Sequence, residues 1–315
     1  MKILKDRFAL ATRHLRKDFT YLAGVSGGRD SVVLLHLLKA VGFQNVIICH
    51  LNHQLRKTAT RDQAFTEKLA FLSNSRIIID KPKDVVDSGS LESKFRKLRH
   101  SFFARVVIET GAKGVFVGHH ADDLAETFLW NLLRGSGSAG LSGIQPEKMI
   151  DTFEGPIRIY RPMLDIWRSE IDLYAQENQL VYMEDETNRS RKFTRNRLRH
   201  DIIPWLETKM QRNVRQNLHR AAAILNEESR CLENMVKIED WDAPLSVAGL
   251  ILQPIALQRR TILSWLQHHQ ISEAGFEEVE LVRSLLDLET GPARINLSKN
   301  RQARRRAGKI NLATQ

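Results

Sequence analysis

The amino-acid sequence predicts an α/β protein with a doubly wound parallel sheet, followed by a smaller, mostly helical C-terminal domain. Three observations support this prediction. Short apolar runs typical of buried strands recur in the first half of the 315-residue chain, a stretch with helical spacing follows each of them, and the sequence changes character after residue 207. Such alternation is typical of parallel sheets that helices cover on both faces.

The first strand and the first helix flank a glycine-rich segment. Residues 21–25 are an apolar run and residues 32–38 have helical spacing, which predicts a strand, a tight loop and a helix. Further strands are expected at 46–51, 76–80 and 114–118, and further helices at about 60–74, 91–110 and 122–133. Ligands of such sheets bind beyond the carboxyl ends of the strands, where segments 26–31, 50–53 and 119–126 fall.

The last third of the chain has a different pattern. Residues 208–285 have the spacing of helices separated by polar breaks, for instance at 214–225 and 255–265. Residues 293–297 and 309–312 can form a hairpin around the basic run 301–306. We therefore expect a catalytic domain over residues 1–207 and a helical domain over residues 208–315.

Composition and charge exclude several classes of protein. No apolar stretch is long enough to span a bilayer, the N-terminus lacks a signal-peptide core, and Cys49 and Cys231 alone make no disulfide framework, so we expect a cytoplasmic protein without a membrane partner. The net charge of +11 favours a polyanionic partner, because basic side chains release counterions from phosphates. A merely basic soluble protein is the alternative.

The segment between the first strand and helix is the most informative part of the chain. Adjacent glycines let a backbone approach a ligand closely, the flanking hydroxyls add donors, and a helix N-terminus offers unpaired N–H groups to an anion. The lysine of a Walker loop is missing, and an ordinary glycine-rich turn is the alternative. The residues expected to hold phosphate are Ser26, Gly27, Gly28, Arg29, Asp30 and Ser31.

A second candidate site lies at the start of the helix expected at 122–133. Asp123 and Glu126 are three residues apart and share a helical face near the phosphate loop. Such a pair can hold Mg²⁺ or bind an amine. Acids that complement the helix dipole are the alternative, and Asp122 suits that role better.

Histidines at 50, 53, 119 and 120 invite a zinc interpretation, but no third type of ligand accompanies them. We expect neutral, hydrogen-bonding histidines, and Arg56 is the more useful residue of that segment because it can contact phosphate.

Arginines gather in two further segments. Arg96 and Arg99 lie on one helical face and can grip a phosphate, although a solvated basic face is the alternative. Arginines at 189, 191, 195, 197 and 199 crowd together with Lys192 and Phe193, as on an RNA-binding surface. A plain charged helix is the alternative.

Taken in order, these segments resemble the tRNA(Ile)-lysidine synthetase family of PP-loop ATP pyrophosphatases. The resemblance is carried by Ser-Gly-Gly-x-Asp-Ser at 26–31, His-x-Asn-His-x-Leu-Arg at 50–56, Arg-x-x-Arg at 96–99, Gly-His-His-x-x-Asp-x-x-Glu-Thr at 118–127, Arg-Gly-x-Gly-x-x-Gly-Leu at 134–141, Arg-Pro-Met-Leu at 161–164, Arg-x-Glu-Ile at 168–171, Glu-Asp-x-Thr-Asn at 184–188 and Arg-Asn-x-x-Arg-x-x-Ile-x-Pro at 195–204. It implies an adenine nucleotide alpha hydrolase-like fold and a short family form, and it leaves room for a homodimer.

The resemblance also implies a two-step reaction on a tRNA(Ile) with a CAU anticodon. ATP adenylates the carbonyl oxygen on carbon 2 of the wobble cytidine, and the ε-amine of free L-lysine then displaces AMP. The product is lysidine, which switches codon reading from AUG to AUA.

The same resemblance assigns roles to residues of this chain. The 26–31 loop would bind ATP, with Asp30 holding Mg²⁺ beside its phosphates, and Asp123 and Glu126 would recognise the lysine amine. Arg96 or Arg99, together with Arg195, would stabilise the intermediate. The residues implied in tRNA binding are Arg56, Arg134, Arg191, Arg195 and Arg199.

Two alternatives stay open. A tRNA thiolase of the same superfamily would attack the adenylated base with sulfur, but two cysteines suit that chemistry poorly. A non-catalytic tRNA-binding protein with a vestigial nucleotide loop belongs to another class, and the intact Asp30, Asp123 and Glu126 disfavour it.

Overall fold

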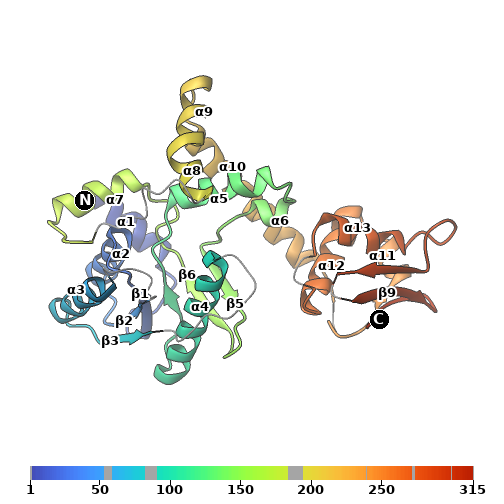
Figure 1. Ribbon diagram of the computed structural model, residues 1–315, viewed down its shortest axis with the longest axis horizontal. Helices are drawn as coiled ribbons and strands as arrows, with labels where there is room; N and C mark the ends of the chain where they lie inside the picture. Colours follow the sequence, from blue (N-terminus) through green and yellow to red (C-terminus); the bar gives the residue numbers. More distant parts are fainter. Residues whose placement is uncertain are drawn as a thin grey trace. The chain divides into compact units, whose positions relative to one another are not determined.

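A computed structural model describes residues 2–52, 59–81, 91–183, 194–238, 240–271, 274–298 and 300–314. The chain divides into two compact units, drawn with their elements in Figure 1. The first comprises Met1–Thr127 and Ile144–His219, and the second comprises Phe128–Gly143 and Arg220–Gln315. The division therefore falls inside helix α10 (Val214–Met235), whereas the sequence analysis placed it at residue 207.

A six-stranded sheet forms the centre of the first unit. Its strands are β1 (Thr20–Gly24), β2 (Asn45–Leu51), β3 (Ile77–Asp80), β4 (Val115–Phe116), β5 (Glu147–Ile150) and β6 (Ile157–Tyr160). They are ordered β3-β2-β1-β4-β6-β5, and all neighbouring pairs are parallel except the β5–β6 hairpin. The predicted parallel α/β architecture is confirmed, with one antiparallel strand added at an edge that the sequence analysis left unassigned.

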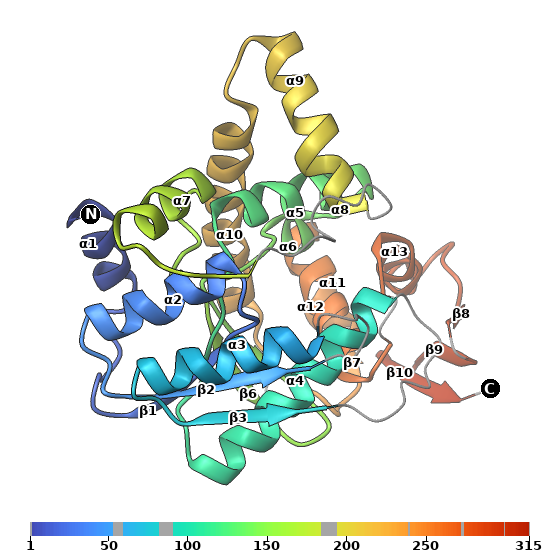
Figure 2. The same cartoon turned by 60° about the vertical axis from the view of Figure 1, so that its left-hand side comes forward.

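Helices cover both faces of this sheet (Figure 2). The helices of the first unit are α1 (Lys2–Ala11), α2 (Arg29–Ala40), α3 (Ala59–Leu72), α4 (Leu91–Thr110), the start of α5 (Ala121–Leu133), α7 (Arg168–Glu177), α8 (Thr194–Arg197), α9 (Ile203–Met210) and the start of α10, with a π-helical segment at Leu198–Ile202. The bounds of α4 agree with the predicted range 91–110, because its helical spacing is uninterrupted.

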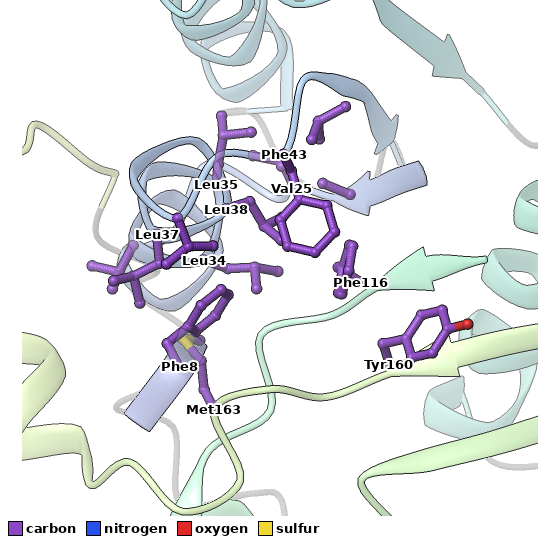
Figure 3. Close-up of a cluster of buried hydrophobic side chains, with 14 of the residues drawn as sticks. Phe8, Val25, Leu34, Leu35, Leu37, Leu38, Phe43, Phe116, Tyr160 and Met163 are labelled. Atoms are coloured by element: carbon purple, nitrogen blue, oxygen red, sulfur yellow. The ribbon is translucent and has the colours of Figure 1, made fainter. Parts of the chain in front are cut away.

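Alternate residues of β1 pack on opposite faces of the sheet, as the two-residue period of a strand requires. Tyr21 and Ala23 belong to the buried cluster that contains α1, α2 and α7, whereas Leu22 belongs to a second cluster that contains Phe103 of α4. Figure 3 shows the first cluster, in which leucines of α2 pack with Phe8 and Met163. Burial on both faces explains why the strands are continuous apolar runs.

The second unit contains more strand than the sequence predicts. Its helices are the rest of α5 and α10, α6 (Ser138–Leu141), α11 (Val247–Ile251), α12 (Ile255–His268) and α13 (Phe276–Ser284). An antiparallel sheet in the order β7-β10-β9-β8 joins β7 (Leu245–Ser246), β8 (Arg294–Leu297), β9 (Arg301–Arg306) and β10 (Lys309–Thr314). The basic run 301–306 is thus a strand and not the loop of a hairpin. Among its core-facing side chains only Ala303 is apolar, so β9 lacks an apolar alternation.

Within the described parts of the chain, no helix combines the length and the apolarity needed to cross a membrane.

Candidate active site

The phosphate-binding loop predicted at residues 26–31 joins the end of β1 to the start of α2. Gly27 has a φ of +89°, a backbone conformation that side chains rarely adopt. The Ser31 hydroxyl donates to the Gly28 carbonyl over 2.8 Å, and the Ser26 amide donates to the Ser31 hydroxyl over 3.2 Å. Since no described side chain caps α2 at Gly28, the amides that begin this helix can bind an anion.

Asp30 lies in the first turn of α2 and has an unusual surrounding. Its Oδ1 atom is buried and has no hydrogen-bond partner among the described residues, while its Oδ2 lies 3.8 Å from His120 Nε2 and 3.7 Å from Arg168 Nη1. A carboxylate oxygen without a partner, next to a phosphate-binding loop, fits a Mg²⁺ ion that substrate phosphates also ligate. No group of three or more metal-ligating side chains occurs in the ranges the structure describes, so such an ion would depend on those phosphates.

Arg29, also predicted to bind ATP, points toward a different element. Its guanidinium pairs with Asp172 of α7 and lies 4.9 Å from the centre of the Tyr182 ring. These contacts tie the phosphate loop to α7, which suggests that Arg29 positions the loop.

The two carboxylates predicted on one face of α5 meet the two arginines predicted downstream. Arg195 donates from Nε to Glu126 Oε2 over 3.1 Å and from Nη2 to Asp123 Oδ1 over 3.0 Å. Arg199 donates from Nε to Glu126 Oε1 over 2.6 Å and from Nη2 to Asp123 Oδ1 over 3.0 Å. Glu126 is only 2% exposed, so its charge depends on these partners.

His120 connects this cluster to Asp30. Burial alone would lower the pKa of His120, but the carboxylates of Asp123, Asp122 and Asp30 outweigh it and raise that pKa above its ordinary value. His120 also acts on Asp122, whose pKa burial would raise. The proximity of His120, whose Nδ1 lies 3.6 Å from Asp122 Oδ2, and a hydrogen bond from the Arg168 amide instead lower the pKa of Asp122 to about 2. His120 thus lies among three carboxylates that favour its protonated form.

A cavity of about 720 Å³ lies beside the His120 cluster. Its wall includes one tryptophan, arginines from three elements, three carboxylates and two amides. The lining residues are Asp122, Trp167, Arg168, Ser169, Asp172, Arg199, His200, Glu207, Asn213, Arg215 and Gln216. Arg215 Nη1 donates to Asp122 Oδ1 over 3.2 Å, so the ionic network continues from Asp30 into this wall.

A group of cations lies on the α4 side of the site. Arg161 is buried, donates to the Gln145 carbonyl over 2.8 Å, and has a buried Nε atom without a partner among the described residues. Burial and the charges of Arg96 and Arg99 lower the pKa of Arg161 to about 10. Positive side chains that converge in this way favour an anionic ligand.

The remaining predicted residues lie elsewhere. Arg134 stacks over the ring of Trp130 at 5.6 Å in the second unit, and both Arg56 and Arg191 lie outside the described residues. The buried His50 makes a 2.9 Å hydrogen bond between its Nδ1 and the Val25 carbonyl oxygen, in the manner expected of a structural histidine.

Sequence reasoning assigned no role to Arg161, Arg168 or Arg215, and it expected His120 only as a neutral, hydrogen-bonding histidine. Arg161 and Arg168 each begin a segment of the family resemblance, 161–164 and 168–171, which was the available signal. Arg215 lies outside these segments. Its contact with Asp122 joins residues 93 positions apart, so the sequence offered no signal for it.

Comparison with known proteins identifies the family of the chain. The model of the PP-loop domain matches residues 3–206. The tRNA(Ile)-lysidine synthase of Gloeobacter violaceus is 32% identical over 273 residues, which cover 84% of this chain and 82% of the relative. The chain belongs to the tRNA(Ile)-lysidine synthase family.

Relatives of this family differ in length. The bifunctional protein TilS/HprT of Listeria monocytogenes is 32% identical over 292 residues, which cover 87% of this chain but 44% of the relative. The synthase of Geobacter sulfurreducens is 31% identical over 94% of this chain and 65% of its own length. The chain thus spans about half to two thirds of these two relatives.

Among solved structures, the U34-tRNA thiolase NcsA of Methanococcus maripaludis is similar in fold, with a TM-score of 0.59 and 23% identity over 72% of this chain and 78% of the thiolase.

Proposed function

We propose that this chain ligates lysine to carbon 2 of the wobble cytidine of a CAU-anticodon tRNA(Ile), with ATP converted to AMP and pyrophosphate. The observation that carries the proposal is the convergence of Asp30 and Asp123 on His120 beside the phosphate loop, with Glu126 joined to Asp123 through Arg195 and Arg199. Family membership supports it. A phosphate loop beside a pair of buried carboxylates suits a reaction that joins an adenylated group to an amine.

In the first step, the carbonyl oxygen on carbon 2 of cytidine attacks the α-phosphorus of ATP, an O–P bond forms, and pyrophosphate leaves. The 26–31 loop binds the phosphates through its hydroxyls and amides. Asp30 would hold Mg²⁺ through its partnerless Oδ1 atom. When bound, the ion offsets the negative charge that develops on the phosphates.

In the second step, the ε-amine of lysine attacks carbon 2, the C–N bond forms, and AMP leaves with the former carbonyl oxygen. The ammonium group must lose a proton before it attacks. Asp123 and Glu126 can bind the ammonium group and accept that proton. The ammonium group must then share the carboxylate oxygens with Arg195 and Arg199. These arginines hold both carboxylates in place until lysine arrives, and the charges of His120 and Arg195 keep the pKa of Asp123 below its ordinary value despite its burial.

The cations on the α4 side have a role in the same scheme. Arg96, Arg99 and Arg161 would grip the phosphate of the adenylated intermediate. Arg56, Arg134, Arg191, Arg195 and Arg199, with the C-terminal domain predicted at 208–315, would contact the tRNA. A cytoplasmic location and a homodimer belong to the same proposal.

The thiolase alternative meets an obstacle at Cys49. Burial raises the pKa of its thiol to about 12, so Cys49 cannot supply a thiolate near neutral pH. Cys231 is exposed on α10, and a single accessible cysteine cannot both hold a cluster and carry a persulfide.

The test is the incorporation of labelled lysine into a CAU-anticodon tRNA(Ile) transcript, with and without ATP and Mg²⁺. We expect transfer that requires ATP and fails on elongator methionine tRNA, which shares the anticodon. Pyrophosphate release without lysine transfer would point to another nucleophile, such as sulfur. Binding of tRNA with neither activity would favour the non-catalytic alternative.

A further inference from the structure

The antiparallel sheet of the second unit, formed by β7 to β10, has one apolar face and one basic face. Ile295, Ala303 and Ile310 lie on the first face and belong to the buried core of the unit. Residues one position away point to the opposite face, because the side-chain period of a strand is two. That opposite face carries Arg294, Asn296, Gln302, Arg304, Arg306, Lys309 and Asn311. We call it the basic sheet face.

Its four cations come from three strands, and all four are exposed. The register places Arg294 opposite Arg304, and Arg306 opposite Lys309. Directly opposed like charges destabilise a sheet, so these pairs weaken the fold. No described carboxylate forms an ion pair with any of the four cations.

The pair at the end of the sheet is held in place by its turn. Ala307 and Gly308, with φ values of 48° and 71°, join β9 to β10. Positive φ at both central residues is typical of a type I′ hairpin, whose twist matches that of the strands. Arg306 and Lys309 are therefore fixed beside each other on a rigid support, which limits the entropy lost when they bind a ligand.

We propose that the basic sheet face binds the phosphate backbone of the tRNA substrate, an inference that rests on the proposed function. Four exposed cations that pair with no described acid favour an anionic partner, and the amide of Asn311 can donate to phosphate or ribose oxygens. Cations two residues apart on β9 project about 6.8 Å apart, a spacing suited to neighbouring phosphates.

The composition of the basic sheet face also indicates that it does not recognise individual bases. None of its residues is aromatic, so it offers no platform for stacking an unpaired base. Contacts to phosphate fix position and carry no sequence information. The basic sheet face therefore supplies affinity for tRNA in general, and the choice among tRNAs is made elsewhere.

The test is a full-length chain with Arg304→Gln and Arg306→Gln, compared with a chain carrying Arg230→Gln and Lys237→Gln. Both variants lose two exposed cations of the second unit, and only the first loses them from the basic sheet face. The measurements are the Kd for tRNA(Ile) and for an unrelated elongator tRNA as a function of salt, the kinetics of lysine transfer, and the thermal midpoint.

We expect the sheet-face variant to bind both tRNAs about tenfold more weakly, with the slope of log Kd against log salt smaller by about 1.5 to 2. The control should change less than twofold. The kcat at saturating tRNA should stay unchanged and the thermal midpoint should not fall, because the variant removes like-charge pairs.

Equal weakening in the control, an unchanged Kd, or loss confined to tRNA(Ile) would each overturn the proposal. A wild-type chain that transfers no lysine while the binding results hold would instead refute the proposed function alone.

Discussion

Glu126 is the residue at which the proposed chemistry and the stability of the fold depend on the same contacts. Its carboxylate is 2% exposed and accepts hydrogen bonds from Arg195 and Arg199. Within the described residues, Glu126→Ala leaves two guanidinium groups with only Asp123 as a hydrogen-bonded carboxylate. Because Arg195 and Arg199 keep 32% and 18% of their side chains exposed, water repays part of this cost, and we expect a loss of about 2 kcal/mol in the free energy of unfolding. Denaturant unfolding measures it.

A second variant separates the two roles of Glu126. Glu126→Gln keeps the shape and one acceptor, so it should retain most of the stability while lysine transfer falls at least tenfold. Pyrophosphate release should fall less than lysine transfer. Equal loss of both steps would contradict the assignment of Glu126 to the lysine amine.

In the proposed reaction, Asp30 acts in the first step alone. Asp30→Asn removes the charge that would hold Mg²⁺ but keeps the size of the side chain, so tRNA-dependent pyrophosphate release should fall by about two orders of magnitude or more. Asp151→Asn, at an exposed carboxylate just after β5, is the matched control. If pyrophosphate release by the two variants depends on the Mg²⁺ concentration in the same way, Asp30 holds no ion.

At the scale of elements, the approach of the β4–α5 connection to the start of α2 decides the geometry of the site. A Cβ atom on Gly118 would lie 3.2 Å from the carbonyl carbon and oxygen of Asp30. Backbone atoms cannot turn aside as a flexible side chain can, so Gly118→Ala should displace the first turn of α2. We expect the KM for ATP to rise severalfold and kcat to fall. Gly137→Ala, where a Cβ meets nothing within 4 Å, should change neither constant.

The segment between β6 and α7 is fastened to α10 by an ion pair that responds to pH. His219 Nε2 lies 3.3 Å from Asp165 Oδ1 and 3.0 Å from the Leu164 carbonyl oxygen. The hydrogen bond with Asp165 raises the pKa of His219 despite its burial. The stabilisation is thus complete below the ordinary pKa of about 6.5 and is lost as the pH rises through the raised value.

Asp165→Asn tests this contact, since it keeps an acceptor and removes the charge. At pH 6 the wild-type chain should be more stable than the variant by about 0.5 kcal/mol, a small value because the Asp165 side chain is 82% exposed. At pH 9 the difference should vanish. A difference that is constant with pH would mean that His219 stays neutral throughout.

These elements also show what a sequence can predict. The helix at 91–110 and the strand at 46–51 follow from local periodicity, which a sequence displays directly. The strand β9 has too few apolar residues to reveal itself, because its outer face is basic and its inner face contains Arg305, which donates to the Leu285 carbonyl. Pairings such as Arg199 with Glu126, 73 residues apart, depend on the assembled fold.

The site follows the same rule. The residues at 26–31, 123 and 126 are distinctive in the sequence because phosphate and amine chemistry need such groups at close spacing, and the structure brings Asp123 and Glu126 together at Arg195. The partner of Arg29 was not predictable, since Asp172 lies 143 residues further along the chain.

At the scale of the whole molecule, the chain has separate buried cores. The clusters on the two faces of the six-stranded sheet lie within the first unit, and the cluster around Trp265 lies within the second. A hydrophobic core is the main source of cooperativity in unfolding, so each unit should unfold in a transition of its own. Calorimetry of the full-length chain should therefore resolve two transitions.

Substitutions in each core identify these transitions. Trp265 is 1% exposed and donates from Nε1 to the Ala243 carbonyl, so Trp265→Ala should destabilise the second unit by about 3 to 5 kcal/mol. Phe116→Ala, at a fully buried ring of the central sheet, should destabilise the first unit by a similar amount and lower the midpoint of its transition. Each variant should leave the remaining midpoint in place. A single transition that both substitutions shift together would show that the two units unfold as one, because a cavity in either core would then be felt by the whole chain.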